Sequence, residues 1–219
     1  MHRHPMRRLP ALLLMLCLLL PALAASAQSP AAPVAGTDYV VIDGGQPWQP
    51  LDGKIEVVEI FAYSCGHCAV FAPMLDKWKR GQPADVRVSY LPVTYESNDP
   101  AARAFFAAQS LGVLDKTHLA LFSAMHTSQT MPHNPSEGEL LNFYADQGVS
   151  SAKLANAMSS PQNAATMAWA HQFMLGSGLQ GTPTLVINGK YRVQAPTHAR
   201  SLEIAGQLIA MARAAAKPR

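Results

Sequence analysis

Two cysteines separated by only two residues constrain the fold of this chain more than any other feature. Cys65 and Cys68 belong to the stretch SCGHCAVFAP. The run before them, Lys54–Ala62 (KIEVVEIFA), is apolar and β-branched, which is typical of a buried central strand. After them, Gly66–Arg80 has apolar residues at helical spacing, and Asp85–Val93 again has the pattern of a strand. The sequence therefore predicts a β-α-β unit in which the cysteine pair lies where the strand gives way to the helix.

The first 27 residues have the pattern of a secretory signal peptide. The segment MHRHPMRR carries three arginines and no acid, an apolar run follows from Leu9 to Leu20, and Ala25–Ala27 is a small-residue cleavage pattern. The alternative is an uncleaved membrane anchor, but Pro10 interrupts the apolar run, which is shorter than the ~20 residues that a spanning helix needs. We therefore expect residues 1–27 to be removed on export.

The positive charge of the chain belongs to this segment. The full chain has 17 Lys and Arg against 14 Asp and Glu, and three of the arginines lie in residues 1–27. Without that segment the acidic and basic residues balance. No basic excess remains that would argue for a nucleic-acid partner, and we expect none.

The cysteine count indicates that the pair reacts rather than staples the fold. One of the three cysteines, Cys17, lies in the predicted signal, so Cys65 and Cys68 are the only two left. An exported protein meets an oxidising compartment, yet a disulfide across two residues closes a very small loop and stabilises a fold little.

The position of the pair predicts two different thiols. Cys65 lies where the helix begins, and free backbone N–H groups and the helix dipole favour an anion there. His67, inside the loop, adds positive charge or a hydrogen bond. Both effects lower the pKa of Cys65 and stabilise the reduced form, which makes the disulfide a stronger oxidant. Cys68 lies one turn further on, where we expect it to be buried and to resolve mixed disulfides.

A zinc site is the competing interpretation of Cys-x-x-Cys. The motif supplies two of the four ligands that such sites commonly need, and the chain has no second motif of this kind. His118 and His126 are eight residues apart on one predicted helix, but we interpret them as surface histidines. We expect neither a metal nor an organic cofactor.

The rest of the chain alternates between helical and strand patterns. Residues 98–178 contain alanine-rich helical segments separated by polar breaks. Strand patterns at Thr184–Asn188 and Tyr191–Val193 flank Gly189-Lys190, which is a hairpin signal, and Ser201–Ala215 has the pattern of a final helix. Pro183 stands just before the first of these strands, either as a strand boundary or as a cis-proline.

SCGHCAVFAP after a buried strand, Pro73 within the following helix and GTPTLVINGKY in the C-terminal third resemble the thioredoxin superfamily. The helical block makes the chain similar to the periplasmic DsbA family of disulfide oxidoreductases. This resemblance implies an α/β thioredoxin fold with an inserted α-helical domain. The thioredoxin-like domain would then comprise 28–97 and 179–219, and the insertion 98–178.

The resemblance also implies roles for residues outside the cysteine motif. It implies that Pro183 is cis and packs against the two cysteines, and that Thr182 offers backbone groups to a substrate chain as if adding a strand. In one respect the loop departs from the family: Gly66-His67 stands where DsbA proteins commonly have Pro-His, and is the pair seen in protein disulfide isomerase.

Glu59 is a carboxylate in an apolar strand, six residues before Cys65. Burial of such a group is costly unless it is paired or protonated. The resemblance makes it a buried proton acceptor near the resolving Cys68, and the alternative is a strand-end residue that reaches water. Family members often pair this acid with a lysine on the neighbouring strand, where this chain has only Arg87. We therefore expect Glu59 to be protonated over a wider pH range.

Taken with the predicted signal, the resemblance implies a monomeric periplasmic oxidase. It would give its Cys65–Cys68 disulfide to newly translocated proteins with cysteine pairs, and a DsbB-like membrane protein would reoxidise it. An isomerase or reductant of the same superfamily is the first alternative. A peptide-binding holdase is the second, and a Cys65→Ala protein with full cellular function would favour it.

Overall fold

The computed structural model describes residues 2, 32–94 and 96–216, so the predicted signal peptide, apart from residue 2, lies outside the described residues. From Ala32 onward these residues form one compact unit. Its elements are β1 (Tyr39–Val41), β2 (Ile55–Phe61), α1 (Gly66–Arg80), β3 (Val86–Pro92), α2 (Pro100–Ser110), α3 (Leu114–His126), α4 (Glu137–Asp146), α5 (Ser151–Met158), α6 (Pro161–Gly176), β4 (Thr184–Ile187), β5 (Tyr191–Val193) and α7 (His198–Ala215).

A five-stranded mixed sheet with the order β1-β5-β4-β2-β3 forms the centre of this unit. β2 runs parallel to β3, with Glu59 opposite Tyr90, and antiparallel to β4, with Glu59 opposite Leu185. All of β2 is buried, which explains its almost continuous apolar sequence. The predicted β-α-β unit is confirmed as β2, α1 and β3.

The hairpin β4-β5 closes through Asn188 and Gly189, which both have positive φ. This turn begins one residue before the predicted Gly189-Lys190. Asn and Gly are the residues that adopt such a left-handed turn at little cost. The predicted hairpin is therefore confirmed, with its turn one residue earlier than expected.

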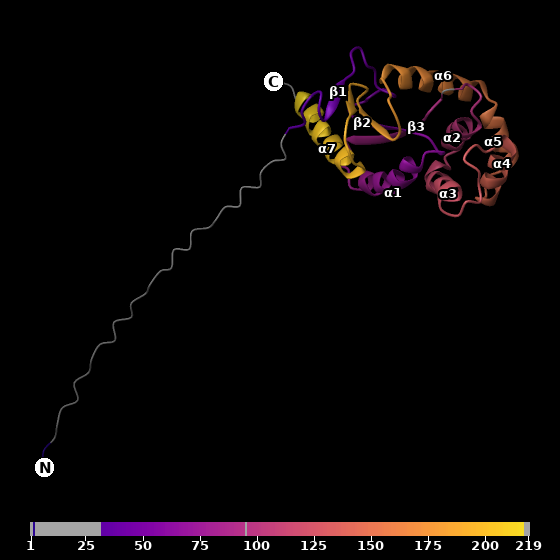
Figure 1. Ribbon diagram of the computed structural model, residues 1–219, viewed down its shortest axis with the longest axis horizontal. Coiled ribbons are helices and arrows are strands. Elements are labelled where there is room, and N and C mark those ends of the chain that lie inside the picture. The colour runs from indigo at the N-terminus through magenta and orange to yellow at the C-terminus, as the bar shows by residue number, and fades with distance from the viewer. Residues whose placement is uncertain (1, 3–31, 95, 217–219) are drawn as a thin grey trace. The chain divides into compact units, whose positions relative to one another are not determined.

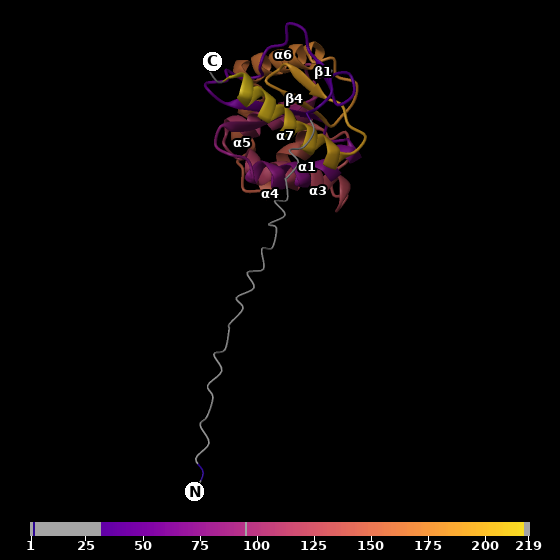
Figure 2. The same cartoon turned by 90° about the vertical axis from the view of Figure 1, so that its left-hand side faces the viewer.

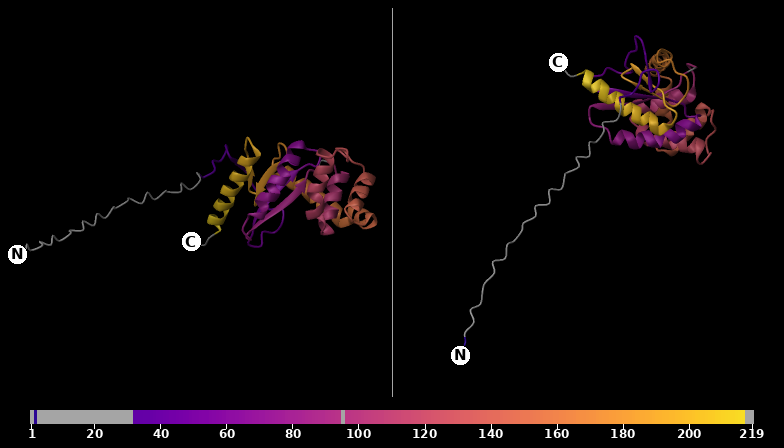
Figure 3. Two further views of the ribbon diagram at one scale, coloured as in Figure 1. Left: turned by 90° about the horizontal axis from the view of Figure 1, so that it is seen from below. Right: turned by 60° about the vertical axis from the view of Figure 1, so that its left-hand side comes forward.

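Helices cover both faces of the sheet. α1 and α7 lie together on one face, and α6 crosses the other (Figure 1). The view turned by 90° and the two further views show the same arrangement (Figures 2 and 3). The redox motif at the start of α1 is therefore held between the end of β2 and the helices of one face.

The helical segment between β3 and β4 is built around α2, which packs against α3, α4, α5 and α6. These helices confirm the expectation of helical segments separated by breaks within residues 98–178. α5, with eight residues, is the shortest of the five. The final helix starts at His198 rather than Ser201, because the Thr197 side chain caps it by accepting a hydrogen bond from the backbone N–H of Arg200 at 3.2 Å.

This architecture confirms the expected α/β fold with helices inserted into it. The bounds that separate the insertion (98–178) from the rest (28–97 and 179–219) stay a prediction. No helix in the described ranges is long and apolar enough to cross a membrane.

Candidate active site

Residues 62–68, which we call the redox turn, run from the end of β2 into the first turn of α1 and hold the two cysteines as free thiols in different surroundings. Cys65 is the N-cap of α1, and its sulfur accepts a hydrogen bond from the backbone N–H of Cys68 at 3.4 Å. Cys65 is half-buried, whereas Cys68 is completely buried, as expected for the first turn of a helix packed on the sheet. One sulfur is thus open to a partner and the other is not.

The surroundings shift the pKa values of the two thiols in opposite directions. Burial by itself raises the pKa of Cys65, but hydrogen bonds with the Thr182 side chain, with Cys68 and with the backbone of His67 outweigh it, so the pKa lies below its ordinary value. Burial raises the pKa of Cys68 far above its ordinary value, and the charge of Cys65 adds to the effect. The expected contrast between a more acidic outer thiol and a less acidic, buried inner thiol is present in the structure.

The loop before β4 faces the outer cysteine. The Thr182–Pro183 peptide bond is cis, as the resemblance implied. The Cys65 thiol donates a hydrogen bond to the Thr182 carbonyl oxygen at 3.4 Å. β4 follows directly and pairs with β2, which brings residues more than a hundred positions apart to one site.

His67 and Gly66 are exposed on the outer side of the redox turn. The His67 ring lies 6.0 Å, centroid to centroid, from the ring of His198 at the start of α7. Burial lowers the pKa of His198, and the charge of His67 lowers it further. His67, Thr182, Pro183 and His198 share an open depression of about 330 Å³ beside the cysteines.

Glu59 is fully buried, and neither of its carboxylate oxygens has a hydrogen-bond partner among the described residues. Burial raises the pKa of Glu59 to about 8, and the charge of Cys65 contributes to the rise. The alternative of a strand-end residue that reaches water is therefore wrong. This buried environment agrees with the expectation that Glu59 keeps its proton over a wider pH range.

Arg87, on the neighbouring strand β3, forms an ion pair with Glu56 and not with Glu59. Arg87 lies opposite Glu56 in the parallel register and binds its carboxylate at 2.9 Å. Glu56 is also completely buried, but it accepts hydrogen bonds from the backbone N–H groups of Trp48 at 2.7 Å and Gln49 at 3.1 Å. Two acids three residues apart thus lie on opposite faces of β2, one paired and one unpaired.

Two histidines of α3 contact Tyr63, which lies within the redox turn. The Tyr63 hydroxyl and His118 Nδ1 are hydrogen-bonded at 2.9 Å, and the His126 Nε2 atom is 2.7 Å from the Tyr63 carbonyl oxygen. His118 is only 5% exposed and its pKa is lowered to about 3 by burial, with the charge of Lys79 contributing. The interpretation of His118 as a surface histidine was wrong.

Sequence reasoning missed this contact although part of the signal was visible. His118 and His126 are eight residues apart on one predicted helix. Tyr63 lies two residues before Cys65. What the sequence could not show is that α3 packs against the redox turn, because that depends on the fold of the inserted helices.

Within the described ranges, no group of three or more potential ligands is placed to hold a metal ion.

Comparisons with known proteins give consistent results. The family model described as thioredoxin matches residues 51–204. The chain is 35% identical over 188 residues to a thiol:disulfide interchange protein DsbA from Pseudomonas aeruginosa, covering 84% of this chain and 87% of the relative. It is 30% identical over 182 residues to the corresponding protein from Burkholderia cepacia, covering 83% of this chain and 84% of the relative.

Solved structures give the same result. The crystal structure of the oxidoreductase DsbA from Xylella fastidiosa superposes with a TM-score of 0.81 at 39% identity, covering 84% of this chain and all of that one. The crystal structure of Pseudomonas aeruginosa DsbA has a TM-score of 0.77 at 33% identity, covering 84% of this chain and 97% of that one.

Proposed function

The chain belongs to the DsbA family of thiol:disulfide oxidoreductases, and we propose that it is an exported oxidase that donates its Cys65–Cys68 disulfide to other proteins. The observation that carries the direction of transfer is the contrast between the two thiols. A Cys65 thiolate stabilised by hydrogen bonds favours the reduced protein, so the oxidised protein tends to give its disulfide away.

The transfer consists of two exchange steps. A substrate thiolate attacks the Cys65 sulfur, the Cys65–Cys68 bond breaks, and Cys68 leaves and takes up a proton because its pKa is high. A second substrate thiolate then attacks the substrate sulfur of the mixed disulfide, and Cys65 leaves as a thiolate. The substrate loses two electrons and two protons, and the low pKa of Cys65 makes it a good leaving group.

Glu59 is the proposed proton acceptor for Cys68. When the protein is reoxidised, the buried Cys68 thiol has to lose its proton before its sulfur can attack. A carboxyl group with a pKa of about 8 is well matched to that task near neutral pH. Its complete burial in β2 keeps the exchange apart from bulk water.

The cis-proline loop is the proposed docking edge for the substrate. Thr182 stands next to Cys65 in the loop before β4, where an extended substrate can add to the backbone in the manner of a strand. Pro183 lacks an N–H group and closes the wall beside the two cysteines. Gly66 and His67 are exposed at the same opening and complete the proposed site.

The proposed partners follow from the family and the predicted signal. Substrates would be exported proteins with pairs of cysteines, and a DsbB-like membrane protein would accept the electrons afterwards. The protein would act as a monomer in the periplasm after loss of residues 1–27, with no organic cofactor and no nucleic acid.

Disulfide transfer to a reduced protein tests the proposal directly. Oxidised protein is mixed one to one with a reduced protein that has a single cysteine pair, and free thiols are followed by alkylation and mass. We expect the substrate disulfide to form as the Cys65–Cys68 disulfide is lost. Cys65→Ala should abolish the transfer, and reduced Cys68→Ala protein should stop at a mixed disulfide when it meets an oxidised substrate.

Two results would contradict the oxidase. Transfer that persists in the Cys65→Ala protein would remove the redox pair from the function and favour the holdase. Reduced protein that repairs a mispaired four-cysteine substrate faster than oxidised protein donates a disulfide would favour the isomerase, for which Gly66-His67 is the motivating observation.

A further inference from the structure

A pocket of about 370 Å³ opens next to the redox turn, on the side away from the cis-proline loop. It is formed by residues 62–64 of the redox turn, 92–93 at the end of β3, 99–102 at the start of α2 and 133–135 in the loop before α4. β3 and β4 flank β2 on opposite sides. The pocket and the proposed docking edge therefore lie on the two sides of Cys65, and nothing described above uses the pocket.

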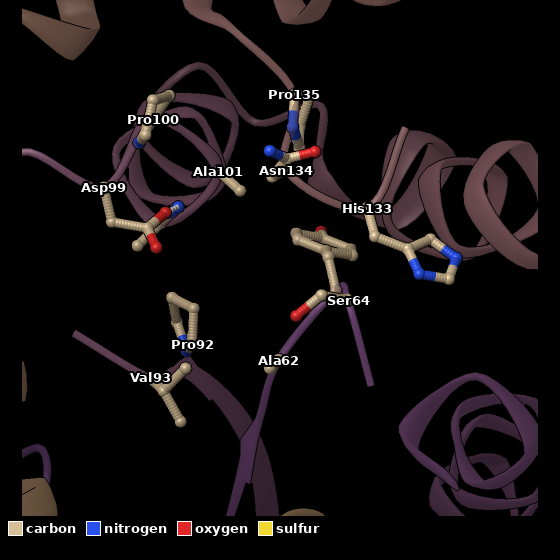
Figure 4. A pocket seen from close by; sticks show the side chains of 12 residues that line it. Ala62, Ser64, Pro92, Val93, Asp99, Pro100, Ala101, His133, Asn134 and Pro135 are labelled. Carbon is tan, nitrogen blue, oxygen red and sulfur yellow. Dashed lines mark hydrogen bonds between the residues drawn. The ribbon is translucent and has the colours of Figure 1, made fainter. Parts of the chain in front are cut away.

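The wall of this pocket combines apolar surface with a few polar groups. Pro92, Val93 and Pro100 supply much of the apolar surface. In Figure 4 the Asp99 carboxylate and the Ser64 hydroxyl point toward the middle of the space, and the His133 ring points away from it. A long side chain with an apolar stem and a polar end would fit such a wall, and the volume lies at the lower end of the range for pockets that enclose small ligands.

The Asp99 carboxylate has one oxygen free for a ligand. Its Oδ1 atom accepts a hydrogen bond from the backbone N–H of Ala102 at 2.8 Å and so caps α2. Within the described residues, neither its Oδ2 atom nor the Ser64 hydroxyl takes part in a hydrogen bond or an ion pair.

Within the described residues, no lysine or arginine forms an ion pair with the Asp99 carboxylate. No lysine or arginine is among the residues that form the pocket. Arg103, one turn further along α2, is engaged by the Glu137 carboxylate at 3.2 Å and by the Met158 carbonyl oxygen. The positive end of the α2 dipole offsets part of the charge, but only part.

We propose that this pocket receives a lysine or arginine side chain of the substrate, from a residue close to the cysteine that is joined to Cys65. The inference rests on the proposed function, because it presupposes a substrate chain held at Cys65. Ser64 belongs to the pocket and directly precedes Cys65, so part of the pocket wall is only one residue along the chain from the reacting cysteine. The alkyl stem would pack on Pro92 and Val93, and the cationic end would reach Asp99.

A competition between peptides tests this proposal. Cys68→Ala protein is charged with glutathione at Cys65 and mixed with equal amounts of two single-cysteine peptides. Each peptide thiolate displaces glutathione as a thiolate, so no oxidant is needed, and mass spectrometry gives the ratio of the two adducts. The peptides differ at one place only, carrying Lys, norleucine or Glu at one of the four positions within two residues of the cysteine.

We expect the Lys peptide to exceed the Glu peptide by about fivefold at one or more positions, with norleucine between them. That factor corresponds to the upper end for a partly exposed ion pair. Asp99→Asn removes the charge but keeps the N-cap, since Asn caps as well as Asp, and should reduce the ratio to less than about twofold. Raising the salt concentration to about 1 M should also reduce it in the parent protein.

Asp146→Asn is the matched control, because Asp146 is exposed at the far end of α4 and makes no part of the pocket. It should leave the ratio unchanged. Equal adducts at every position, a preference for Glu, or a Lys preference that survives Asp99→Asn would each overturn the proposal. The competition measures the side-chain preference of the pocket whether the protein oxidises or reduces its substrates. Failure of the oxidase function would be seen separately, in the disulfide-transfer experiment.

Discussion

At the scale of single residues, the buried carboxyl group of Glu59 makes the stability of the fold depend on pH. Its pKa is raised by burial to about 8 in the folded protein, from an ordinary value near 4.5. Below the ordinary value both the folded and the unfolded chain hold the proton. As the pH rises from there to about 8, the unfolded chain gives the proton up first, so the fold loses stability.

Glu59→Gln should therefore remove a pH dependence. The free energy of unfolding of the parent protein should fall between pH 5 and pH 8 by about 3 kcal/mol more than that of the variant. Denaturant unfolding of the reduced proteins across this range measures the difference in slope, in which any fixed effect of the amide cancels. Parallel curves for the two proteins would mean that Glu59 titrates normally.

The second residue-scale prediction concerns the hydrogen bond of Tyr63. Tyr63→Phe keeps the ring in the core but leaves the Nδ1 atom of the buried His118 without its partner. We expect a loss of about 1–3 kcal/mol in the free energy of unfolding, the range for an unsatisfied buried polar group. Tyr39→Phe, at the edge strand β1, is the control and should change stability by less than about 0.5 kcal/mol. Equal effects of the two substitutions would show that the Tyr63–His118 contact contributes nothing.

Some of this chemistry could be predicted from the sequence and some could not. The low pKa of Cys65 and the burial of Cys68 follow from a cysteine pair at the start of a helix, which is a local pattern. The buried position of Glu59 follows from its place inside an apolar strand. The contact between Tyr63 and His118 joins residues 55 positions apart, and no local pattern predicts which histidine of α3 turns inward.

At the scale of elements, the register between β2 and β3 decides which acid is paired. Arg87 lies opposite Glu56, so its guanidinium reaches the face of β2 that Glu59 does not occupy. The sequence shows one arginine on the second strand and two acids on the first. Only the register assigns the arginine to Glu56, and a shift by one residue would place it on the other face.

Arg87→Met tests the energetic importance of that pairing. It leaves the fully buried Glu56 with only its two backbone donors, and we expect a loss of about 3 kcal/mol in the free energy of unfolding. Arg213→Met removes an ion pair with Asp85 between partly exposed side chains, and should reduce stability by less than about 1 kcal/mol. Thermal or denaturant unfolding compares the two, and a larger effect at Arg213 would contradict the account.

At the scale of the whole molecule, the active site exists only because distant segments meet. β2, α1 and the loop before β4 each carry part of it, and the inserted helices hold the redox turn through α3. The order of elements and the α/β class could be predicted because strands and helices here have clear periodicity. The packing of α2 to α6 could not, because alanine-rich helices give little information about which faces meet.

The equilibrium reduction potential of the Cys65–Cys68 pair tests the central claim most directly. It is measured against glutathione, with the two redox forms separated by alkylation and mass. Because the structure lowers the pKa of Cys65 and so favours the reduced form, we predict a potential between about −180 and −120 mV, toward the end where strong disulfide donors lie. A potential of about −200 mV or below would contradict the account, since the pair would then hold its disulfide too firmly to act as an oxidase.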